Sequence, residues 1–386
     1  MDNKPRFSPT ICLTYDCNLA CVYCYQKHDS NTKMSISTAK ECIDWIFNNI
    51  PNDMSGVEIG FIGGEPLLEF DLIKRIFEYT KSLNISDKYI FYATTNGTVL
   101  NSEMKQWFSI NKDEFVLGLS LDGSPHTHNA NRSNSFEAID IEFFITTWPQ
   151  QGVKMTLTED SLTNLAENII YIHSLGFREI NGVNLFEGSF DWSKERYIDI
   201  LIPQLEELVE YYVNNDNLEI DQMLNKRIEL CENSDSDAKK WCGIGTGAIF
   251  FDVDGVRTPC PFCSPMTFDK NALEQMAKQD FSKIENFIDE ECYMNCYIYP
   301  VCPYCAGANY LTQGTFKERD KSKCRIQKLI TLFAADLIAK RIIKNPDRFS
   351  ESEKYYKIQA IEKIRSMYLQ EFEPFLNKPK THGLLD

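Results

Sequence analysis

Three cysteines near the start of the chain constrain its chemistry more than any other feature. Cys17, Cys21 and Cys24 follow the spacing C-x3-C-x2-C, directly after a short apolar run that predicts the first strand. Three thiolates this close in sequence can surround one iron–sulfur cube. Such clusters are normally held by four cysteines, so three ligands would leave one iron open to a small molecule. The alternative is a zinc knuckle, but no further Cys or His stands at zinc-site spacing, His28 being the only local candidate.

The composition limits where the protein can work and what it can bind. The chain has 386 residues, 43% of them hydrophobic and 25% charged, which fits a globular protein of about two domains. It has no signal-peptide core and no run near the roughly 18 apolar residues of a membrane helix, so we expect a cytoplasmic protein without membrane association. A net charge of −16 argues against a nucleic-acid partner. Because the cytoplasm keeps thiols reduced, fourteen cysteines predict metal or cluster ligation.

Strands and helices alternate after the cysteine loop. Helical periodicity begins after Thr38-Ala39-Lys40-Glu41, which fits a capping box. Together with the first strand, the apolar runs predict about six βα units, fewer than the eight of a closed barrel. The later runs that predict strands are 57–62, 89–95, 115–121, 153–158 and 179–186.

Polar or glycine-rich segments follow three of these strands. They are Gly63-Gly64-Glu65-Pro66, Thr94-Thr95-Asn96-Gly97 and Ser120-Leu121-Asp122-Gly123. The carboxyl ends of barrel strands carry active-site residues, and glycines there let the backbone approach a ligand closely. Each segment taken singly is typical of an ordinary turn. In this order at strand ends, they predict ligand contacts.

Together these features resemble the radical S-adenosylmethionine (SAM) superfamily. In that family, one open iron of a 4Fe-4S cluster chelates the amino and carboxylate groups of SAM's methionine. The resemblance implies an α/β fold, a partial (β/α)6 barrel, over residues 1–214. It also implies that Glu65 is a charged partner of the methionine amino group and that Arg132 lies near the carboxylate. The implied cofactor-binding residues are Tyr23, Gly63, Gly64, Glu65, Pro66, Asn96, Ser120, Asp122 and Arg132.

The second half of the chain contains most of the cysteines. Nine of the fourteen lie from Cys231 to Cys324, and the spacing of Cys242, Gly255 and Cys260 resembles the opening of a SPASM domain. That extension carries auxiliary iron–sulfur clusters in peptide-modifying radical SAM enzymes. Four later cysteines follow C-x3-C-x5-C-x2-C, whereas the family pattern is C-x2-C-x5-C-x3-C. The resemblance implies a SPASM domain with its linker over residues 215–324 and a C-terminal helical extension over 325–386.

The resemblance also implies how these cysteines divide between two auxiliary 4Fe-4S clusters. The first cluster would use Cys242, Cys260 and Cys305. Its fourth ligand would be Cys231 or Cys263, or the position would stay open to substrate. The second cluster would use Cys292, Cys296, Cys302 and Cys324. The alternative is a pair of zinc ribbons in a non-enzymatic zinc scaffold.

The implied activity is that of a peptide-modifying oxidoreductase. Reductive cleavage of SAM at the cluster of Cys17, Cys21 and Cys24 yields a 5′-deoxyadenosyl radical, and a thioether or carbon–carbon crosslink then forms in a ribosomally synthesised precursor peptide. The implied cofactors are three 4Fe-4S clusters and SAM. The implied electron donor is flavodoxin or ferredoxin. Only about ten residues precede the first strand, so we expect a leader peptide to bind elsewhere on the chain, to bind a separate protein, or not to be needed.

Two other peptide-directed activities remain as alternatives. A sulfatase-maturating enzyme is expected to have an aspartate base directly after the cysteine that follows Gly-x4, and Pro261 stands there. A peptide epimerase needs a free thiol that returns a hydrogen atom, for which Cys263 is the candidate.

Overall fold

The computed structural model describes residues 6–185, 191–232 and 243–376. In this part of the chain, nine strands form one sheet in the order β7-β6-β5-β4-β3-β1-β8-β9, with β2 paired to β1. The strands are β1 (Ser8–Tyr15), β2 (Asp29–Lys33), β3 (Val57–Gly63), β4 (Tyr89–Thr95), β5 (Phe115–Ser120), β6 (Val153–Leu157), β7 (Ile180–Leu185), β8 (Ala248–Phe251) and β9 (Arg257–Thr258).

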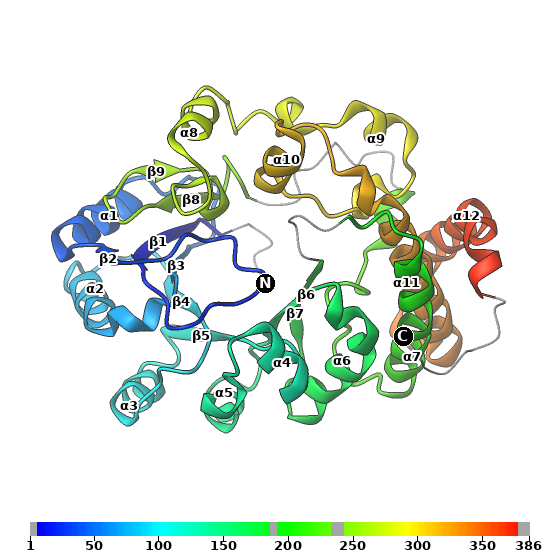
Figure 1. Cartoon of the computed structure of the whole chain (residues 1–386), viewed down its shortest axis with the longest axis horizontal. Helices are drawn as coiled ribbons and strands as arrows, with labels where there is room; N and C mark the ends of the chain where they lie inside the picture. The colour runs from blue at the N-terminus through cyan, green and yellow to red at the C-terminus, as the bar shows by residue number, and fades with distance from the viewer. Residues whose placement is uncertain (1–5, 186–190, 233–242, 377–386) are drawn as a thin grey trace.

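Six strands, β1 and β3 to β7, run parallel and are linked by helices on the outer side of the sheet (Figure 1). The path of strand pairs ends at β7 and β9, so the sheet does not close. This confirms the expected α/β fold with an open sheet and six βα units. The helices are α1 (Ile36–Asn48), α2 (Phe70–Ser82), α3 (Ser102–Ile110), α4 (Pro125–Asn131), α5 (Ile141–Thr147), α6 (Leu165–Ser174) and α7 (Arg196–Asn214).

Helix α1 begins earlier than its sequence pattern predicts. The helix starts at Ile36, and its N-cap is Ser35, whose hydroxyl accepts a hydrogen bond of 3.1 Å from the Thr38 N–H. The prediction that Thr38 is the cap is therefore wrong. Both residues carry a hydroxyl that can accept from a free N–H in the first turn, so composition alone does not choose between them.

A layer of phenylalanine rings joins the sheet to its outer helices. Phe61, Phe91 and Phe115 lie on three adjacent strands and stack, with ring centroids 5.6 Å apart for Phe61–Phe91 and 5.9 Å for Phe91–Phe115. Trp107 and Phe108 of α3 pack edge-on against Phe115. Because alternate side chains of a strand point to opposite faces, these rings all face the outer helices.

The sheet extends beyond the barrel strands. β8 pairs in parallel with β1, in a register that joins Ser8 to Ala248 and Ile11 to Phe251, and β9 completes an antiparallel hairpin with β8. The sheet therefore runs across the expected domain boundary at residue 214.

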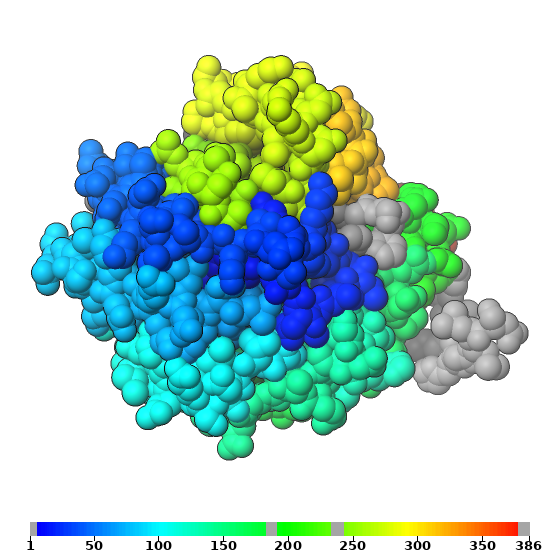
Figure 2. Space-filling view, turned by 60° about the vertical axis from the view of Figure 1, so that its left-hand side comes forward, coloured from blue at the N-terminus to red at the C-terminus, as the bar shows by residue number. Residues whose placement is uncertain are grey.

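The remaining residues form a cysteine-rich segment and a helical C-terminus. The cysteine-rich segment (residues 243–324) contains a small apolar core of its own around Phe268, Phe281 and Phe316, and it lies directly on the N-terminal residues (Figure 2). At the C-terminus, α11 packs against both α7 and α12. The expected helical extension is thus confirmed. The helices are α8 (Lys270–Met276), α9 (Glu290–Asn295), α10 (Ala306–Gln313), α11 (Cys324–Lys344) and α12 (Glu351–Leu376).

Among the described helices, none has the length and apolar character needed to cross a membrane.

The ring layer yields the first prediction. Phe91→Ala should lower the free energy of unfolding by about 3–5 kcal/mol, because it removes a fully buried ring and leaves a cavity between two others. Ile110→Ala is the matched control, since the Ile110 side chain at the end of α3 is 73% exposed. Urea unfolding of both variants checks this. A loss for Phe91→Ala no larger than that of the control would contradict the core assignment.

Candidate functional site

The three N-terminal cysteines lie on the loop between β1 and β2. Cys17 and Cys21 are half-buried and Cys24 is exposed, and all three are free thiols. The Leu19 N–H donates to Cys17 Sγ over 3.5 Å. Burial raises the pKa of the Cys17 thiol to about 11, against the effect of that hydrogen bond. Three sulfur donors on one loop, with a backbone N–H directed at one of them, fit a cluster with three protein ligands.

His28, the local zinc candidate, lies beside one of these cysteines. Its Nε2 atom is 3.3 Å from Cys24 Sγ, and its Nδ1 atom is 3.2 Å from the Tyr15 carbonyl oxygen. In the part of the chain that the structure describes, no three His, Cys, Asp or Glu side chains converge on one metal-ion position.

Gly63 and Gly64 let the end of β3 approach the cysteine loop. A Cβ atom on Gly64 would lie 2.2 Å from the Asp16 carbonyl oxygen and 2.7 Å from Cys17 Cβ, and one on Gly63 would lie 2.5 Å from the Thr14 carbonyl oxygen. The Gly64 N–H donates to the Thr14 carbonyl over 3.1 Å. The sequence predicted close approach to a ligand. The close contact in the structure is with the chain's own loop, directly beside a predicted iron ligand.

Glu65 joins two of the strand-end segments. It is buried, and its carboxylate accepts hydrogen bonds from Leu67 N–H (3.0 Å), the Thr95 hydroxyl (2.8 Å) and Asn96 N–H (2.8 Å). Burial raises the pKa of the Glu65 carboxyl to about 6, although these hydrogen bonds oppose the rise. The residue after it, Pro66, begins a short 3-10 helix, Pro66–Glu69. Glu65 therefore fixes the geometry between the Gly63–Pro66 and Thr94–Gly97 segments.

Asn96 connects its own strand end to the cysteine loop. Its amide donates to Asn18 Oδ1 over 2.9 Å, and its own oxygen accepts from the Thr98 N–H over 2.9 Å. Asn18 in turn donates to the Thr98 hydroxyl over 2.8 Å. The predicted residues at the ends of β3 and β4 thus meet the loop that carries the cysteines.

Asp122 and Arg132 form a buried ion pair with two contacts. Arg132 Nε lies 2.9 Å from Asp122 Oδ2, and Arg132 Nη2 lies 3.2 Å from Oδ1. The Tyr23 hydroxyl donates to Asp122 Oδ2 over 2.6 Å, and the guanidinium lies 5.2 Å from the Tyr23 ring centroid. The Thr156 N–H of β6 donates to Oδ1 over 3.1 Å. This pair fixes Tyr23, and with it the cysteine loop, to the ends of β5 and β6.

Lys154 is a site residue that sequence reasoning missed. It pairs in register with Ser120, the half-buried predicted residue at the end of β5. Its ammonium group donates to the Thr94 hydroxyl over 2.9 Å. The sequence did offer one sign of this role: Lys154 is the only charged residue of its strand, Val153–Leu157.

The cysteine loop also contacts the cysteine-rich segment. The Tyr15 hydroxyl donates to both carboxylate oxygens of Asp252, over 2.7 and 2.8 Å. The Tyr25 ring stacks on Phe262 with ring centroids 4.8 Å apart. The Lys27 N–H donates to the carbonyl of Met266 over 2.8 Å. The loop is therefore held between the barrel strands and the segment with the later cysteines.

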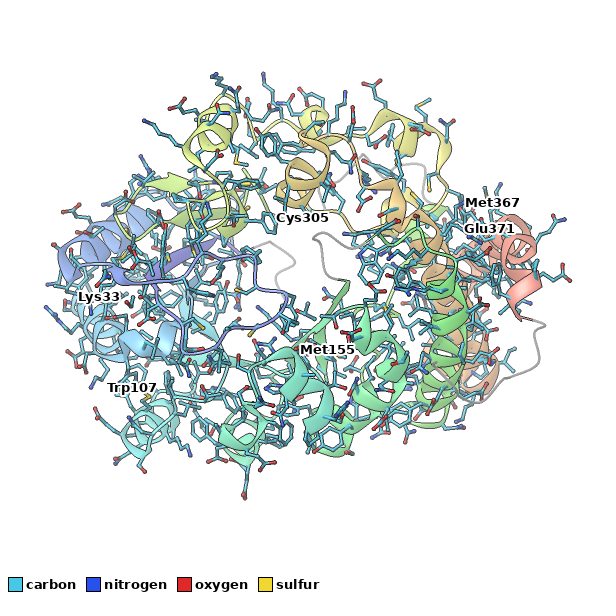
Figure 3. The ribbon with its side chains drawn as sticks, in the orientation of Figure 1. Lys33, Trp107, Met155, Cys305, Met367 and Glu371 are labelled. Atoms are coloured by element: carbon cyan, nitrogen blue, oxygen red, sulfur yellow. The ribbon has the colours of Figure 1, made fainter. Side chains whose placement is uncertain are left out.

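Two of the cysteines predicted for the first auxiliary cluster meet at Tyr25. Electrostatic interactions join the Tyr25 hydroxyl to Cys260, Cys24 and Cys305, and Figure 3 shows Cys305 on the inner side of the cysteine-rich segment. We call Cys260 and Cys305 the first cysteine pair. Cys242, the third predicted ligand, lies outside the described residues. Cys263 is buried in the apolar core of the segment, and its N–H donates to the Cys260 carbonyl over 3.1 Å.

The four cysteines predicted for the second auxiliary cluster lie together. The pKa of the Cys324 thiol is raised to about 11, first by burial and then by neighbouring thiolates. Cys231 packs against the main apolar core, as Cys296 does, whereas Cys260 packs against the core of the cysteine-rich segment. Burial and then Cys296 raise the pKa of the Cys231 thiol to about 12. We call the four predicted ligands the second cysteine set. Its members are Cys292, Cys296, Cys302 and Cys324.

Comparison with known proteins gives one family and several relatives. Residues 11–140 match the model of the radical SAM superfamily. A cysteine-type anaerobic sulfatase-maturating enzyme of Clostridium perfringens is 25% identical over 319 residues, 74% of this chain and 84% of that protein. A radical SAM cyclopropyl synthase of Paramaledivibacter caminithermalis, TigE, is 22% identical over 336 residues, 81% of this chain and 71% of that protein.

Solved structures show the same fold. A structure of anSMEcpe with bound AdoMet has a TM-score of 0.67 at 20% identity, covering 86% of this chain and 98% of that chain. Streptococcus suis SuiB bound to its precursor peptide SuiA has a TM-score of 0.57 at 15% identity, covering 83% of this chain and 76% of that chain.

The ion pair yields the second prediction. Asp122→Asn should lower the free energy of unfolding by about 3–5 kcal/mol, because Arg132 would remain buried without its counter-charge. Glu103→Gln is the control, since it breaks an exposed 2.8 Å pair with Lys74 and such pairs contribute at most about 1 kcal/mol. Denaturant unfolding distinguishes them. Equal losses in both variants would show that the Asp122 contacts do not hold the loop.

Proposed function

Because the chain belongs to the radical SAM superfamily through its residues 11–140, we propose that it is a peptide-modifying enzyme with a SPASM domain, which crosslinks a ribosomally synthesised precursor peptide. One observation carries this proposal: the ring of Tyr25, the residue after Cys24, stacks on Phe262, two residues after Cys260, with ring centroids 4.8 Å apart. A substrate at the SAM site would therefore lie beside the first auxiliary site as well.

The residues of this site fit SAM and a 4Fe-4S cluster. When bound, the reduced cluster supplies one electron that cleaves SAM to methionine and a 5′-deoxyadenosyl radical, which takes a hydrogen atom from the substrate. Cys17, Cys21 and Cys24 would hold the cluster. Glu65 and Asn96 position the strand-end backbone around it, and Asp122 with Arg132 keeps Tyr23 and the loop in place. The protein's part is position and exclusion of water.

The relatives support a peptide substrate. Three of the solved structures are named for a bound peptide: SuiB with its precursor SuiA, and anSMEcpe with AdoMet and either the Cp18Cys or the Kp18Cys peptide. The auxiliary cysteines favour an oxidative product, because a crosslink releases a second electron and proton after the hydrogen atom has left. Cys260, Cys305 and the second cysteine set would hold clusters that accept this electron.

The alternatives are less well supported by the side chains. Sulfatase maturation is suggested by the Clostridium relative, but Pro261 occupies the position where its carboxylate base is expected and cannot accept a proton. Epimerisation needs an accessible thiol, and Cys263, the candidate, is only 1% exposed in an apolar core.

The third prediction tests SAM cleavage. Changing Cys17, Cys21 and Cys24 together to Ala should abolish formation of 5′-deoxyadenosine under dithionite, because no iron would remain to deliver the electron. Cys42→Ala is the control, since that thiol is buried on α1 away from the loop. Chromatography of the products measures the nucleoside. Undiminished cleavage by the purified triple variant would refute the proposal.

The fourth prediction concerns the product. A peptide encoded by a short reading frame beside this gene should become lighter by about two mass units per bond formed, because a crosslink removes two hydrogen atoms. Incubation with SAM, followed by fragmentation of the product in a mass spectrometer, tests this. An unchanged mass with deuterium gained from heavy water at an α-carbon would select the epimerase instead.

A further inference from the structure

Three cationic side chains surround the second cysteine set, and two of them are buried. Lys226 is 8% exposed and Arg319 is 9% exposed, while Lys321 lies nearer the surface. Lysine and arginine are almost never this deeply buried unless their charge is paired. The question is which negative group pairs with them.

Lys226 makes only neutral hydrogen bonds. Its ammonium group donates to the Val301 carbonyl over 3.2 Å and to Gln327 Oε1 over 3.5 Å. No carboxylate among the described residues lies within ion-pair distance of it. It interacts electrostatically with the thiolates of Cys302 and Cys231 and, less strongly, with the buried carboxylate of Asp221. A buried ammonium group without a counter-ion costs several kcal/mol, and the sulfur site provides the larger part of this counter-charge.

Arg319 is a second buried cation beside the second cysteine set. Its Nη1 atom donates to the Cys302 carbonyl over 3.4 Å, and its Nε atom is buried without a hydrogen-bond partner in the described part of the chain. The guanidinium lies 4.2 Å from the Tyr299 ring centroid and 4.9 Å from that of Tyr304. It also interacts with the thiolates of Cys302 and Cys292.

Lys321 is the third cation beside the second cysteine set, and its side chain is partly exposed. Its ammonium group lies 2.9 Å from Cys292 Sγ. Unlike the other two, it has carboxylate partners, Asp289 at 2.9 Å and Glu291 at 3.4 Å. Its charge is therefore partly compensated before any cluster binds.

We propose that Lys226 and Arg319 are the counter-charges of the second auxiliary cluster and raise its reduction potential. This inference rests on the proposed function. A four-iron cluster with four thiolate ligands carries net negative charge, and reduction adds one more electron. Buried cations beside it favour the reduced form, since net charge and hydrogen bonds set these potentials.

The first cysteine pair has different surroundings. The Cys260 thiol interacts first with the Cys263 side chain and then with the backbone N–H groups of Cys263 and Phe262, and these hydrogen bonds lower its pKa. Tyr25 and Phe262 cover this side with stacked rings.

Potentiometric titration of the reconstituted full-length protein, followed by electron paramagnetic resonance, tests the inference. Lys226→Met keeps the length of the side chain and removes its charge. It should shift the reduction equilibrium of one auxiliary cluster about tenfold toward the oxidised form, about 59 mV for one electron. Lys226→Arg keeps the charge, so the potential of this variant should stay close to that of the wild type. Lys317→Met is the control, because Lys317 is exposed and pairs with Glu290 at 2.9 Å.

The outcomes are distinct. Equal potentials in wild type, Lys226→Met and Lys317→Met, at equal iron content, would overturn the inference. If Lys226→Met does not retain its clusters, Arg319→Gln decides: the same signal should move in the same direction, and an unmoved signal overturns the inference. A wild type that binds only about four irons overturns it together with the auxiliary-cluster assignment. If Lys226→Met shifts the potential as expected but the wild type does not cleave SAM, only the proposed function is overturned.

Discussion

The buried carboxylate of Asp122 is the contact on which the arrangement of the site depends. Its two oxygens form an ion pair with Arg132. They also accept hydrogen bonds from the Tyr23 hydroxyl in the cysteine loop and from a backbone N–H of β6. None of the loop residues 16–28 is fully buried, so the loop needs such a fixed contact to keep one conformation. In a low-dielectric interior an ion pair with this many hydrogen bonds is highly directional, since each lone pair already has a partner. The loop is therefore positioned by the barrel before any cofactor binds.

A second set of contacts places the later cysteines relative to the first three. Tyr15 and Asp252 stand at the ends of two adjacent strands, β1 and β8, and bind each other directly. Tyr25, ten residues after Tyr15, stacks on Phe262, ten residues after Asp252. Strand pairing is rigid and has a fixed register, so the separation between the two cysteine groups is set by the sheet. Electron transfer between groups depends on such a separation, and a shared sheet keeps it constant.

Local patterns predicted the parts of this structure that local physics determines. The parallel strands, the strand-end segments and the N-terminal cysteine loop all follow from periodicity and short spacing. The prediction placed Gly63 and Gly64 correctly at a close approach, although the partner in the structure is the Asp16 backbone. It placed the cap of α1 at Thr38, because Ser35 and Thr38 carry equivalent hydroxyls. The pairing of β8 with β1, the position of Cys231 beside Cys296 and the burial of Lys226 depend on residues far apart in sequence. No local pattern encodes them.

The pairing of β1 with β8 has a consequence for how the chain is made. Ile11 meets Phe251 in the register, a sequence separation of 240 residues. On a ribosome adding about 5–20 residues per second, one edge of β1 must wait roughly 12–48 s for its partner. Throughout that time the strand leading into the cysteine loop presents free backbone donors and acceptors, which other chains could pair with. This edge of β1 is thus open to pairing with other chains until β8 has been made.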